Sequence, residues 1–496
     1  MVMNEIVQKL AKQFPVASMV QAEFEYALDP HDLDRLFLKQ GHGYMQDLLF
    51  SQVVNLMSLV VGKMTPSVRS ACHLLSKELD VGLNSVYEKL KRLQPETSAA
   101  LVRHIYGRLA PVVDELGPPH DPLFEGYETR IVDGKHLDGS QRRLEAIRKY
   151  NAQPLPGQLL VTLDRERDLV CDVVACEDAH AQERKFFDRL LPQVQPGEVW
   201  IEDRNFCTTQ FVFGVAGRGA ALIVRRHKST LYIQGESELT KRGHTDTGVV
   251  YEGTLRLTNR QGEELTLRRI VIELNKPTSE GDERIELLTN LPDSIPAMQI
   301  ATGYRDRWQI EELFGKIASF LNAEMETLGY PKAALFAFCV ALVSYNLLQT
   351  CRAALGNAHG REWVAANISS YYLNVEVRAA ARTVHGLLTD TSYAEGLREQ
   401  SPRQLAQYLT SVAATAYLKR YPKSSRGPKK PPPRRFTGAD TVTYRRTGNC
   451  KRPKADASFC ERGGKHRHAV VLDQRVIQGV GLKQQLRAGP ALKVRG

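Results

Sequence analysis

The stretch "EVWIED" (Glu198–Asp203) is a short apolar run that ends in an acidic residue, and "TRIVDG" (Thr129–Gly134) shows the same arrangement earlier in the chain. Short runs of this kind, rich in β-branched residues, favour buried strands. Two further runs, "QLLVTLD" (Gln158–Asp164) and "DLVCDVVA" (Asp168–Ala175), flank the tight link "RER", which is typical of a β-hairpin. We therefore predict three strands before Glu198–Asp203, with the acids beside the link as turn residues.

Helices are predicted on both sides of Glu198–Asp203, in "AQERKFFDRLLPQV" and "TTQFVFGVAG", and "ALIVRR" (Ala221–Arg226) predicts a further strand. Three strands, the first ending in Asp, are thus followed by a helix, a strand ending in Asp, a helix and a strand. This is the order of a ribonuclease-H-like α/β core. Residues 228–298 are almost all strand in pattern, so the core is predicted to be interrupted by a β-rich insertion.

The N-terminal region is predicted to be helical. "TPSVRSACHLLSKELDVGLNSVYEKLKRL" (Thr65–Leu93) predicts two helices around a short turn, the second beginning with a capping box at Ser85. The pair has helix-turn-helix proportions and would present Lys89, Lys91 and Arg92 to a DNA groove. Ordinary packing of two helices is the alternative interpretation.

Basic charge is concentrated in the last part of the sequence. The net charge is +11, but between Lys419 and Lys454 there are 13 Lys or Arg and one acid, Asp440, a local net charge of +12. "KSSRGPKKPPPRR" (Lys423–Arg435) is also rich in Pro and poor in large apolar residues, so residues 421–496 are predicted to be a disordered tail. A basic tail binds phosphate backbones without sequence preference. A merely solvated tail is the alternative.

The composition, with 42% hydrophobic and 25% charged residues, is that of an ordinary soluble protein. No run approaches the roughly 20 apolar residues of a membrane span. The first residues are too polar for a signal peptide. We therefore expect a cytoplasmic protein without a membrane partner.

The helical pattern "YRDRWQIEELFGKI" (Tyr304–Ile317) aligns three polar side chains. Tyr304, Arg307 and Glu311 recur at intervals of three and four residues, so a continuous helix would place them along one side. The simplest interpretation is an exposed Arg–Glu pair, worth roughly a few tenths of a kcal/mol. Trp308 points elsewhere on that helix and is predicted to be a core residue.

Three acids in these segments suggest a metal site. Asp133 and Asp203 are each predicted at the carboxyl end of a strand, where ligands bind in open α/β sheets, and Glu311 would come from the helix after the insertion. Such carboxylates suit a hard cation such as Mg²⁺, and two ions about 3.5–4 Å apart clamp the oxygens of a phosphoryl displacement. Each Asp alone could be a turn or cap residue. Their joint occurrence favours catalysis.

The combination resembles the insertion-sequence transposases of the DDE class (IS-four type), in the group with the signature Tyr-x2-Arg-x3-Glu-x6-Lys. "YRDRWQIE" (residues 304–311) has that spacing, "DGKHLDGSQRRL" (Asp133–Leu144) resembles the first-Asp block, and "IEDRNF" (Ile201–Phe206) resembles the second. The β-rich insertion before the Glu is likewise similar. The likeness covers about residues 129–346.

The resemblance implies that Asp133, Asp203 and Glu311 hold two Mg²⁺ ions, for which Mn²⁺ would substitute. It implies that Arg307 and Tyr304 grip DNA phosphates near the cleavage site. A metal-activated water would cleave DNA at the element end, and the freed 3′-hydroxyl would then attack target DNA. The implied partners are the terminal repeats, the target DNA and a second copy of the chain in a synaptic homodimer, within a prokaryotic cell and associated with its nucleoid.

The sequence departs from this group in two ways. The signature Lys would fall at Ala318, and the nearest Lys, Lys316, is about 140° around a helix from Glu311, although its long side chain could still bind the same phosphate. Some members stack a flipped base on a Trp of the insertion, and residues 228–298 contain no Trp. A ribonuclease-H-like nuclease that only hydrolyses DNA, and an inactive copy that competes for element ends, therefore remain alternatives.

The predicted division of the chain is a helical region with a candidate helix-turn-helix (1–118), the first part of the catalytic core (119–227), the β-rich insertion (228–298), the second part of the core with the Glu helix (299–356), a helical region (357–420) and the basic tail (421–496).

Overall fold

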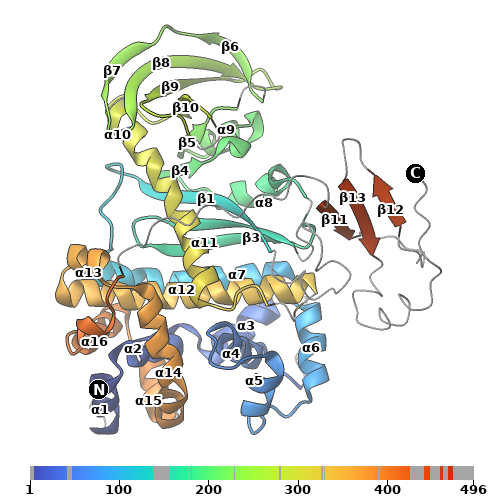
Figure 1. Cartoon of the computed structure of the whole chain (residues 1–496), viewed down its shortest axis with the longest axis vertical. Helices are drawn as coiled ribbons and strands as arrows, with labels where there is room; N and C mark the ends of the chain where they lie inside the picture. The colour runs from blue at the N-terminus through green and yellow to red at the C-terminus, as the bar shows by residue number, and fades with distance from the viewer. Residues whose placement is uncertain are drawn as a thin grey trace.

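The structure is a computed structural model. It describes residues 5–41, 47–137, 157–179, 181–227, 230–278, 281–325, 328, 330–388 and 391–424, together with the backbone of 441–446, 458–461 and 467–472. A large mixed sheet runs through the molecule, with long helices across one face and a mainly helical region beyond them (Figure 1). The fold is therefore mixed α/β, as predicted.

The sheet has ten strands in the order β3-β2-β1-β4-β5-β10-β9-β8-β6, and β7 pairs with β8. β1 is antiparallel to β2 and parallel to β4, which is parallel to β5. This arrangement of the first five strands is compatible with a ribonuclease-H-like core. The strands are β1 Glu128–His136, β2 Gln158–Asp164, β3 Leu169–Cys176, β4 Glu198–Glu202, β5 Ala221–Arg225, β6 Tyr232–Glu236, β7 Thr240–His244, β8 Gly248–Thr258, β9 Glu264–Leu274 and β10 Arg284–Thr289.

The central strands are covered on both faces. Successive side chains of a strand point to opposite faces, and Ile131 and Val132 of β1 accordingly belong to two different hydrophobic cores. One core continues into the helices α7, α11 and α12, and the other lies against α8 and α9. Because both faces are buried, β2 shows no alternation in burial along its whole length.

The predicted turn acids at the β2–β3 link differ in role. Asp168 has a φ of 52° and lies in the turn as predicted. Asp164 is fully buried instead, because Arg130, Arg167 and Tyr106 surround its carboxylate at 2.9, 2.8 and 2.6 Å. These partners make Asp164 part of a structural ion-pair network.

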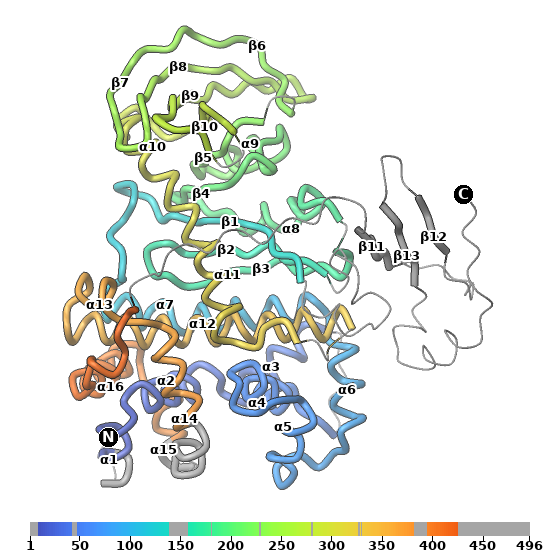
Figure 2. The backbone as a smooth tube through the Cα atoms, in the orientation of Figure 1, coloured from blue at the N-terminus to red at the C-terminus, as the bar shows by residue number. Residues whose placement is uncertain are grey.

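The strands β6–β10, in the predicted β-rich insertion, extend the same sheet, because β10 pairs with β5 of the core. Figure 2 shows them at the end of the molecule farthest from the N-terminal helices. β6 and β7 are mostly exposed, whereas β8 alternates in burial along much of its length and β9 is mostly buried through its middle.

The remaining chain is largely helical. The α-helices are α1 Glu5–Gln13, α2 Pro15–Ala27, α3 Pro30–Lys39, α4 Phe50–Val61, α5 Val68–Leu74, α6 Leu83–Arg92, α7 Pro95–Leu116, α8 Phe187–Leu190, α9 Thr209–Ala216, α10 Ala297–Gly303, α11 Trp308–Phe320, α12 Pro331–His359, α13 Arg361–Asn367, α14 Ser370–Leu388, α15 Thr391–Arg398 and α16 Pro402–Ala413. The short 3₁₀ helices are η3 Glu183–Phe186, η4 Leu191–Gln193, η5 Arg204–Phe206, η6 Tyr304–Arg307 and η7 Leu418–Arg420.

Helix α12 forms the centre of the helical region. Asn346, fully buried, both donates to and accepts from the backbone of Val170, so its amide completes the hydrogen bonding of β3. Among the described residues, α12 is the one helix long and apolar enough to cross a membrane, but 94% of its most apolar window is buried within the protein. Such burial is that of a core helix.

The candidate helix-turn-helix differs from the prediction. Helix α6 begins at Leu83 with Gly82 as its N-cap and without a side-chain cap, so the predicted capping box at Ser85 is wrong: Ser85 already lies inside the helix. The preceding helix α5 already ends at Leu74, eight residues before Gly82. The connection is therefore longer than the three to four residues usual in this motif.

The tail also differs from the prediction at three segments. β11 Thr441–Arg446, β12 Ser458–Glu461 and β13 Arg467–Leu472 form a separate sheet in the order β11-β13-β12. "TVTYRR" and "RHAVVL" contain the β-branched and aromatic residues that favour strands. The other residues after 424, including most of the Pro-rich run, lie outside the described part.

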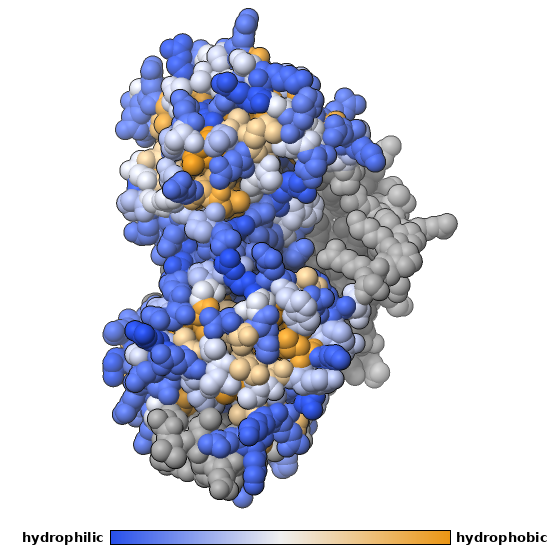
Figure 3. Space-filling view, turned by 90° about the vertical axis from the view of Figure 1, so that its left-hand side faces the viewer, coloured by the Kyte–Doolittle hydropathy of each residue, from blue (hydrophilic) through white to orange (hydrophobic). Residues whose placement is uncertain are grey.

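The face of the molecule seen in Figure 3 is mostly hydrophilic. On this face, hydrophilic residues cover the narrow middle of the molecule, and hydrophobic residues gather in small patches above and below it (Figure 3).

Candidate active site

The parallel pairing of β1 with β4 brings Asp133 and Asp203 to the same level of the sheet. The last paired residues are Ile131 and Ile201, and each Asp comes two positions later. Asp203 directly follows β4, as predicted. Asp133 lies inside β1 rather than at its end, because β1 remains paired with β2 as far as His136.

Local hydrogen bonds orient both side chains. Asp133 Oδ1 accepts from the backbone N–H of Gly134 at 2.8 Å. Asp203 Oδ1 accepts from the backbone N–H of Asn205 at 2.7 Å and so caps the short helix η5. Neither interaction uses both carboxylate oxygens, so each Asp keeps an oxygen for another partner.

Glu311 reaches this site from α11, which crosses the sheet face beside β1 (Figure 1). Arg307 links the two elements: its Nη2 donates to Glu311 Oε1 at 2.9 Å, and its Nη1 lies 3.5 Å from Asp133 Oδ2. The guanidinium therefore lies between two of the three predicted metal ligands. The site joins residues from β1, from the end of β4 and from α11.

One continuous helix through Tyr304, Arg307 and Glu311 was predicted, but the helix is interrupted in the structure. Residues 304–307 form the 3₁₀ helix η6, between α10 and α11. A 3₁₀ turn contains three residues instead of 3.6, but Arg307 is the N-cap of α11 and still lies one turn before Glu311. The Arg–Glu pair therefore forms despite the break.

The two aromatic residues of the signature segment are placed differently from expectation. Trp308 is 60% exposed, so its prediction as a core residue is wrong; it is the first residue of α11, and the Arg307 guanidinium lies 5.3 Å from its ring centre. Tyr304 is instead buried within the core. Burial, with a smaller effect of Asp203, raises the pKa of Tyr304, so its hydroxyl stays protonated.

The carboxylates influence one another. Burial raises the pKa of Asp133 to about 6, and the charges of Asp203 and Glu311 act in the same direction. The Gly134 N–H and Arg307 oppose this shift. Asp203 and Glu311 therefore lie near enough to Asp133 for their charges to act on it.

A fourth acid, Glu183 of η3, lies in the same place and was missed in the sequence. Burial, followed by the charges of Asp203 and Asp133, raises its pKa to about 7. Its position in "ERKFF" gave no signal, because an acid in the first turn of a helix is ordinary. The fold, not the local pattern, brings it to the site.

The donor set fits a divalent cation. All four groups offer carboxylate oxygens, the ligands preferred by Mg²⁺ and Ca²⁺, and Arg307 is the one cation paired with them among the described residues. No three His, Cys, Asp or Glu side chains in the described part are gathered closely enough to hold a metal ion as they stand. Arg307 occupies the space between Asp133 and Glu311, and it would have to move for both to share a cation.

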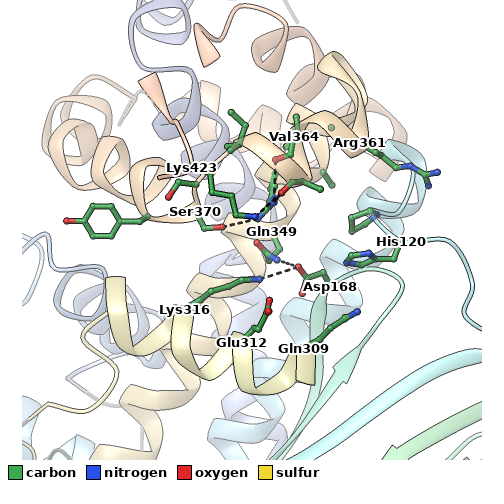
Figure 4. Close-up of a pocket in the computed structure, with 18 of the residues that line it drawn as sticks. His120, Asp168, Gln309, Glu312, Lys316, Gln349, Arg361, Val364, Ser370 and Lys423 are labelled. Atoms are coloured by element: carbon green, nitrogen blue, oxygen red, sulfur yellow. Dashed lines mark hydrogen bonds and ion pairs between the residues drawn. The ribbon is translucent and has the colours of Figure 1, made fainter. Parts of the chain in front are cut away.

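Lys316 lies on a different side of α11 from Glu311. It lines a pocket of about 620 Å³ between α11, α12 and the start of α14 (Figure 4). Its Nζ lies 3.9 Å from Asp168 Oδ2 and 5.7 Å from the ring centre of Tyr345. This placement agrees with the predicted rotation away from Glu311, and DNA binding by Lys316 stays a prediction.

The basic residues of α6 are largely engaged within the protein. Lys89 lies 4.3 Å from the ring centre of Phe37, and Lys91 forms an ion pair of 2.6 Å with Glu88. Arg92 has an 81% exposed side chain. DNA binding by these three residues also stays a prediction, with Arg92 the most accessible of them.

Part of this chain is similar to known proteins. Residues 125–347, a little under half of the chain, match the family model described as "Transposase DDE domain". The match contains Asp133, Asp203 and Glu311, and it supports a DDE transposase domain, a class of enzymes that uses divalent metal ions and binds DNA.

A curated protein supports the same class. Over 160 residues the chain is 28% identical to "Putative transposase y4zB" of Sinorhizobium fredii (strain NBRC 101917 / NGR234). The aligned part covers 32% of this chain and 43% of that protein. The chain thus spans less than half the length of this relative.

Proposed function

We propose that the chain is a DNA transposase that cleaves DNA at the ends of an insertion element and transfers the 3′-hydroxyl end into target DNA. The observation that carries this proposal is the placement of Asp133 and Asp203 at one level of the sheet, with Glu311 linked to Asp133 through Arg307. All of these residues lie in the region that matches the transposase domain.

Asp133, Asp203 and Glu311 would hold the divalent cations. When bound, such ions activate a water and stabilise the charge on the attacking and leaving oxygens of a phosphodiester. The protein's own part is to hold three carboxylates, one on β1, one directly after β4 and one on α11, which fixes where the scissile phosphate must lie. Mg²⁺ is the proposed ion, and Mn²⁺ would substitute.

Arg307 would exchange its partners when DNA binds. Its guanidinium is a planar donor suited to two oxygens of a phosphate or carboxylate. Without DNA it neutralises Asp133 and Glu311. With cations on those acids, Arg307 would be free to bind a phosphate beside the cleaved bond. Tyr304, which is buried in the core, would hold the segment of residues 304–307 in place.

The test is strand transfer from a pre-cleaved end. A duplex that ends in the element's terminal 3′-hydroxyl is incubated with the protein, a plasmid target and Mg²⁺, and joined products are sequenced. The proposal predicts covalent joining of the 3′-hydroxyl to plasmid DNA. Hydrolysis without joining would indicate a nuclease, and binding without either reaction would indicate an inactive competitor.

A further inference from the structure

Glu183 lies directly against the backbone of β1 beside Asp133. A Cβ atom added to Gly134 would lie 2.1 Å from Glu183 Oε1 and 3.1 Å from its carboxyl carbon. Distances this short are impossible for real atoms, so the space that any other residue would fill at position 134 is taken by the carboxylate of Glu183. The glycine after Asp133 thus makes room for a second acid.

The loop after β4 contacts the same carboxylate from the other side. Asn205, two residues after Asp203, has its Nδ2 3.4 Å from Glu183 Oε2. Glu183 is therefore held between the residue that follows Asp133 and the loop that follows Asp203. Gly134 and Asn205 each donate a backbone N–H to one of the two Asp carboxylates, and both residues also lie beside the Glu183 carboxylate.

The negative charge at this place is not balanced. Arg307 pairs with Asp133 and Glu311, but among the described residues Glu183 forms no ion pair with a Lys, Arg or His side chain. A half-buried carboxylate without a paired cation is costly, so such a group takes up a proton, pairs with a cationic side chain or binds a metal ion. A site with more carboxylates than cations, in which one carboxylate occupies a gap left by a glycine, is arranged to receive a cation.

We propose that Glu183 is a fourth acidic residue of the cation site formed by Asp133, Asp203 and Glu311. This inference rests on the proposed function, because it assigns Glu183 to the same site. Its carboxylate supplies charge to a divalent cation next to Asp133 and Asp203, directly or through a bound water. The role of Glu183 is to hold the cation, and no proton transfer is assigned to it.

The experiment measures Mn²⁺ binding and folding separately from activity. Wild type, Glu183→Gln, Glu183→Ala and the control Glu312→Gln are titrated with Mn²⁺ at pH 8, and free Mn²⁺ is followed by electron paramagnetic resonance. Glu312 is a matched control, because it is an exposed acid of α11 that lines the pocket on the other side of the helix. Thermal unfolding is recorded in EDTA and in Mn²⁺.

The expected result is a 10- to 100-fold weaker Mn²⁺ affinity of both Glu183 variants, the usual loss when an acid that supports a metal is removed, and no change in Glu312→Gln. In EDTA the Glu183→Gln protein should unfold at a higher temperature than wild type, since a repulsive charge is gone. A merely structural acid would instead give a lower unfolding temperature.

Unchanged Mn²⁺ affinity in both Glu183 variants would overturn the inference, while metal-dependent cleavage by the wild type would leave the proposed function intact. If the wild type itself bound no Mn²⁺ and cleaved no DNA, the proposed function would fail with it. The wild-type data alone distinguish these two cases.

Discussion

Arg307 and Glu311 form an ion pair of 2.9 Å across one turn of α11, and the same guanidinium extends to within 3.5 Å of Asp133. Arg307, which was predicted to bind DNA, thus pairs with Asp133 and Glu311, which were predicted to bind metal ions. The Arg307 guanidinium therefore neutralises two of the acids that are proposed to hold the cations.

Arg307→Ala should be severe in cleavage, and Lys316→Ala mild. A charge-assisted hydrogen bond to a phosphate is worth roughly 1.5–3 kcal/mol, which is about one to two decades in rate. Lys316 faces Asp168 in the pocket instead of Glu311. Single-turnover cleavage at saturating Mg²⁺ measures both, with Arg305→Ala, an exposed residue paired with Asp246, as the control on the same segment. Equal large losses would show that Lys316 has taken over the role of the signature Lys.

Asp133→Asn, Asp203→Asn and Glu311→Gln should each abolish cleavage, by about a thousandfold or more, because several kcal/mol of transition-state stabilisation depend on the metal. DNA binding should stay within a few fold, since it rests on other groups. Gel-shift and cleavage measurements on the same preparations test this. A variant that cleaved at the wild-type rate would remove that residue from the site.

Deleting the chain after residue 424 should weaken DNA binding and flatten its salt dependence. Each phosphate neutralised contributes about −0.9 to the slope of log K against log salt. The cut keeps Tyr421, whose buried hydroxyl bonds to Glu376, and Lys423, whose N–H donates to Asn367. Sequence preference should survive, because base contacts belong to folded elements. An unchanged slope would show that the tail does not touch DNA.

His104 should lower the free energy of unfolding as the pH falls below about 6.5. Burial lowers the pKa of His104, and nearby Arg108 acts in the same direction against Asp29 and Asp32. The Nε2 of His104 is buried and has no hydrogen-bond partner among the described residues. Below its ordinary pKa the unfolded state binds a proton that the folded state does not, so unfolding becomes favoured. This contribution is absent above pH 6.5 and grows as the pH falls towards the lowered value.

Guanidinium unfolding of wild type and His104→Gln at pH 7.5 and 5 would measure this contribution of His104 to stability. The His73→Gln variant, changed at an exposed residue, serves as the control. The His104 variant should lose less stability between the two pH values than wild type does. Equal losses in all three proteins would place the acid sensitivity elsewhere.

The sequence indicated the strands and the order of the core, because short apolar runs between turns report burial directly. It also brought Asp133, Asp203 and Glu311 forward, since strand ends and helical spacing are local features. Trp308 was misplaced because periodicity gives the direction of a side chain but not what covers it. The break at residues 304–307 was missed for another reason. A 3₁₀ turn of three residues and an α turn of 3.6 residues give nearly the same spacing over a short segment.

Glu183 could not have been found from its surroundings in the chain. It is 50 residues from Asp133 in sequence, and only the packing of η3 against β1 brings them together. The capping box at Ser85 shows the opposite error, in which a correct local pattern is overruled because the helix begins earlier, at Leu83.

Cleavage of a duplex that contains an element end with its flanking DNA, by wild type and by Asp203→Asn, in Mg²⁺ and in EDTA, tests metal-dependent catalysis by the carboxylates of Asp133, Asp203 and Glu311. We expect a cut at the element end, with a 3′-hydroxyl, by the wild type in Mg²⁺ and in no other sample. Cleavage that persists in EDTA or in Asp203→Asn would contradict catalysis by these carboxylates.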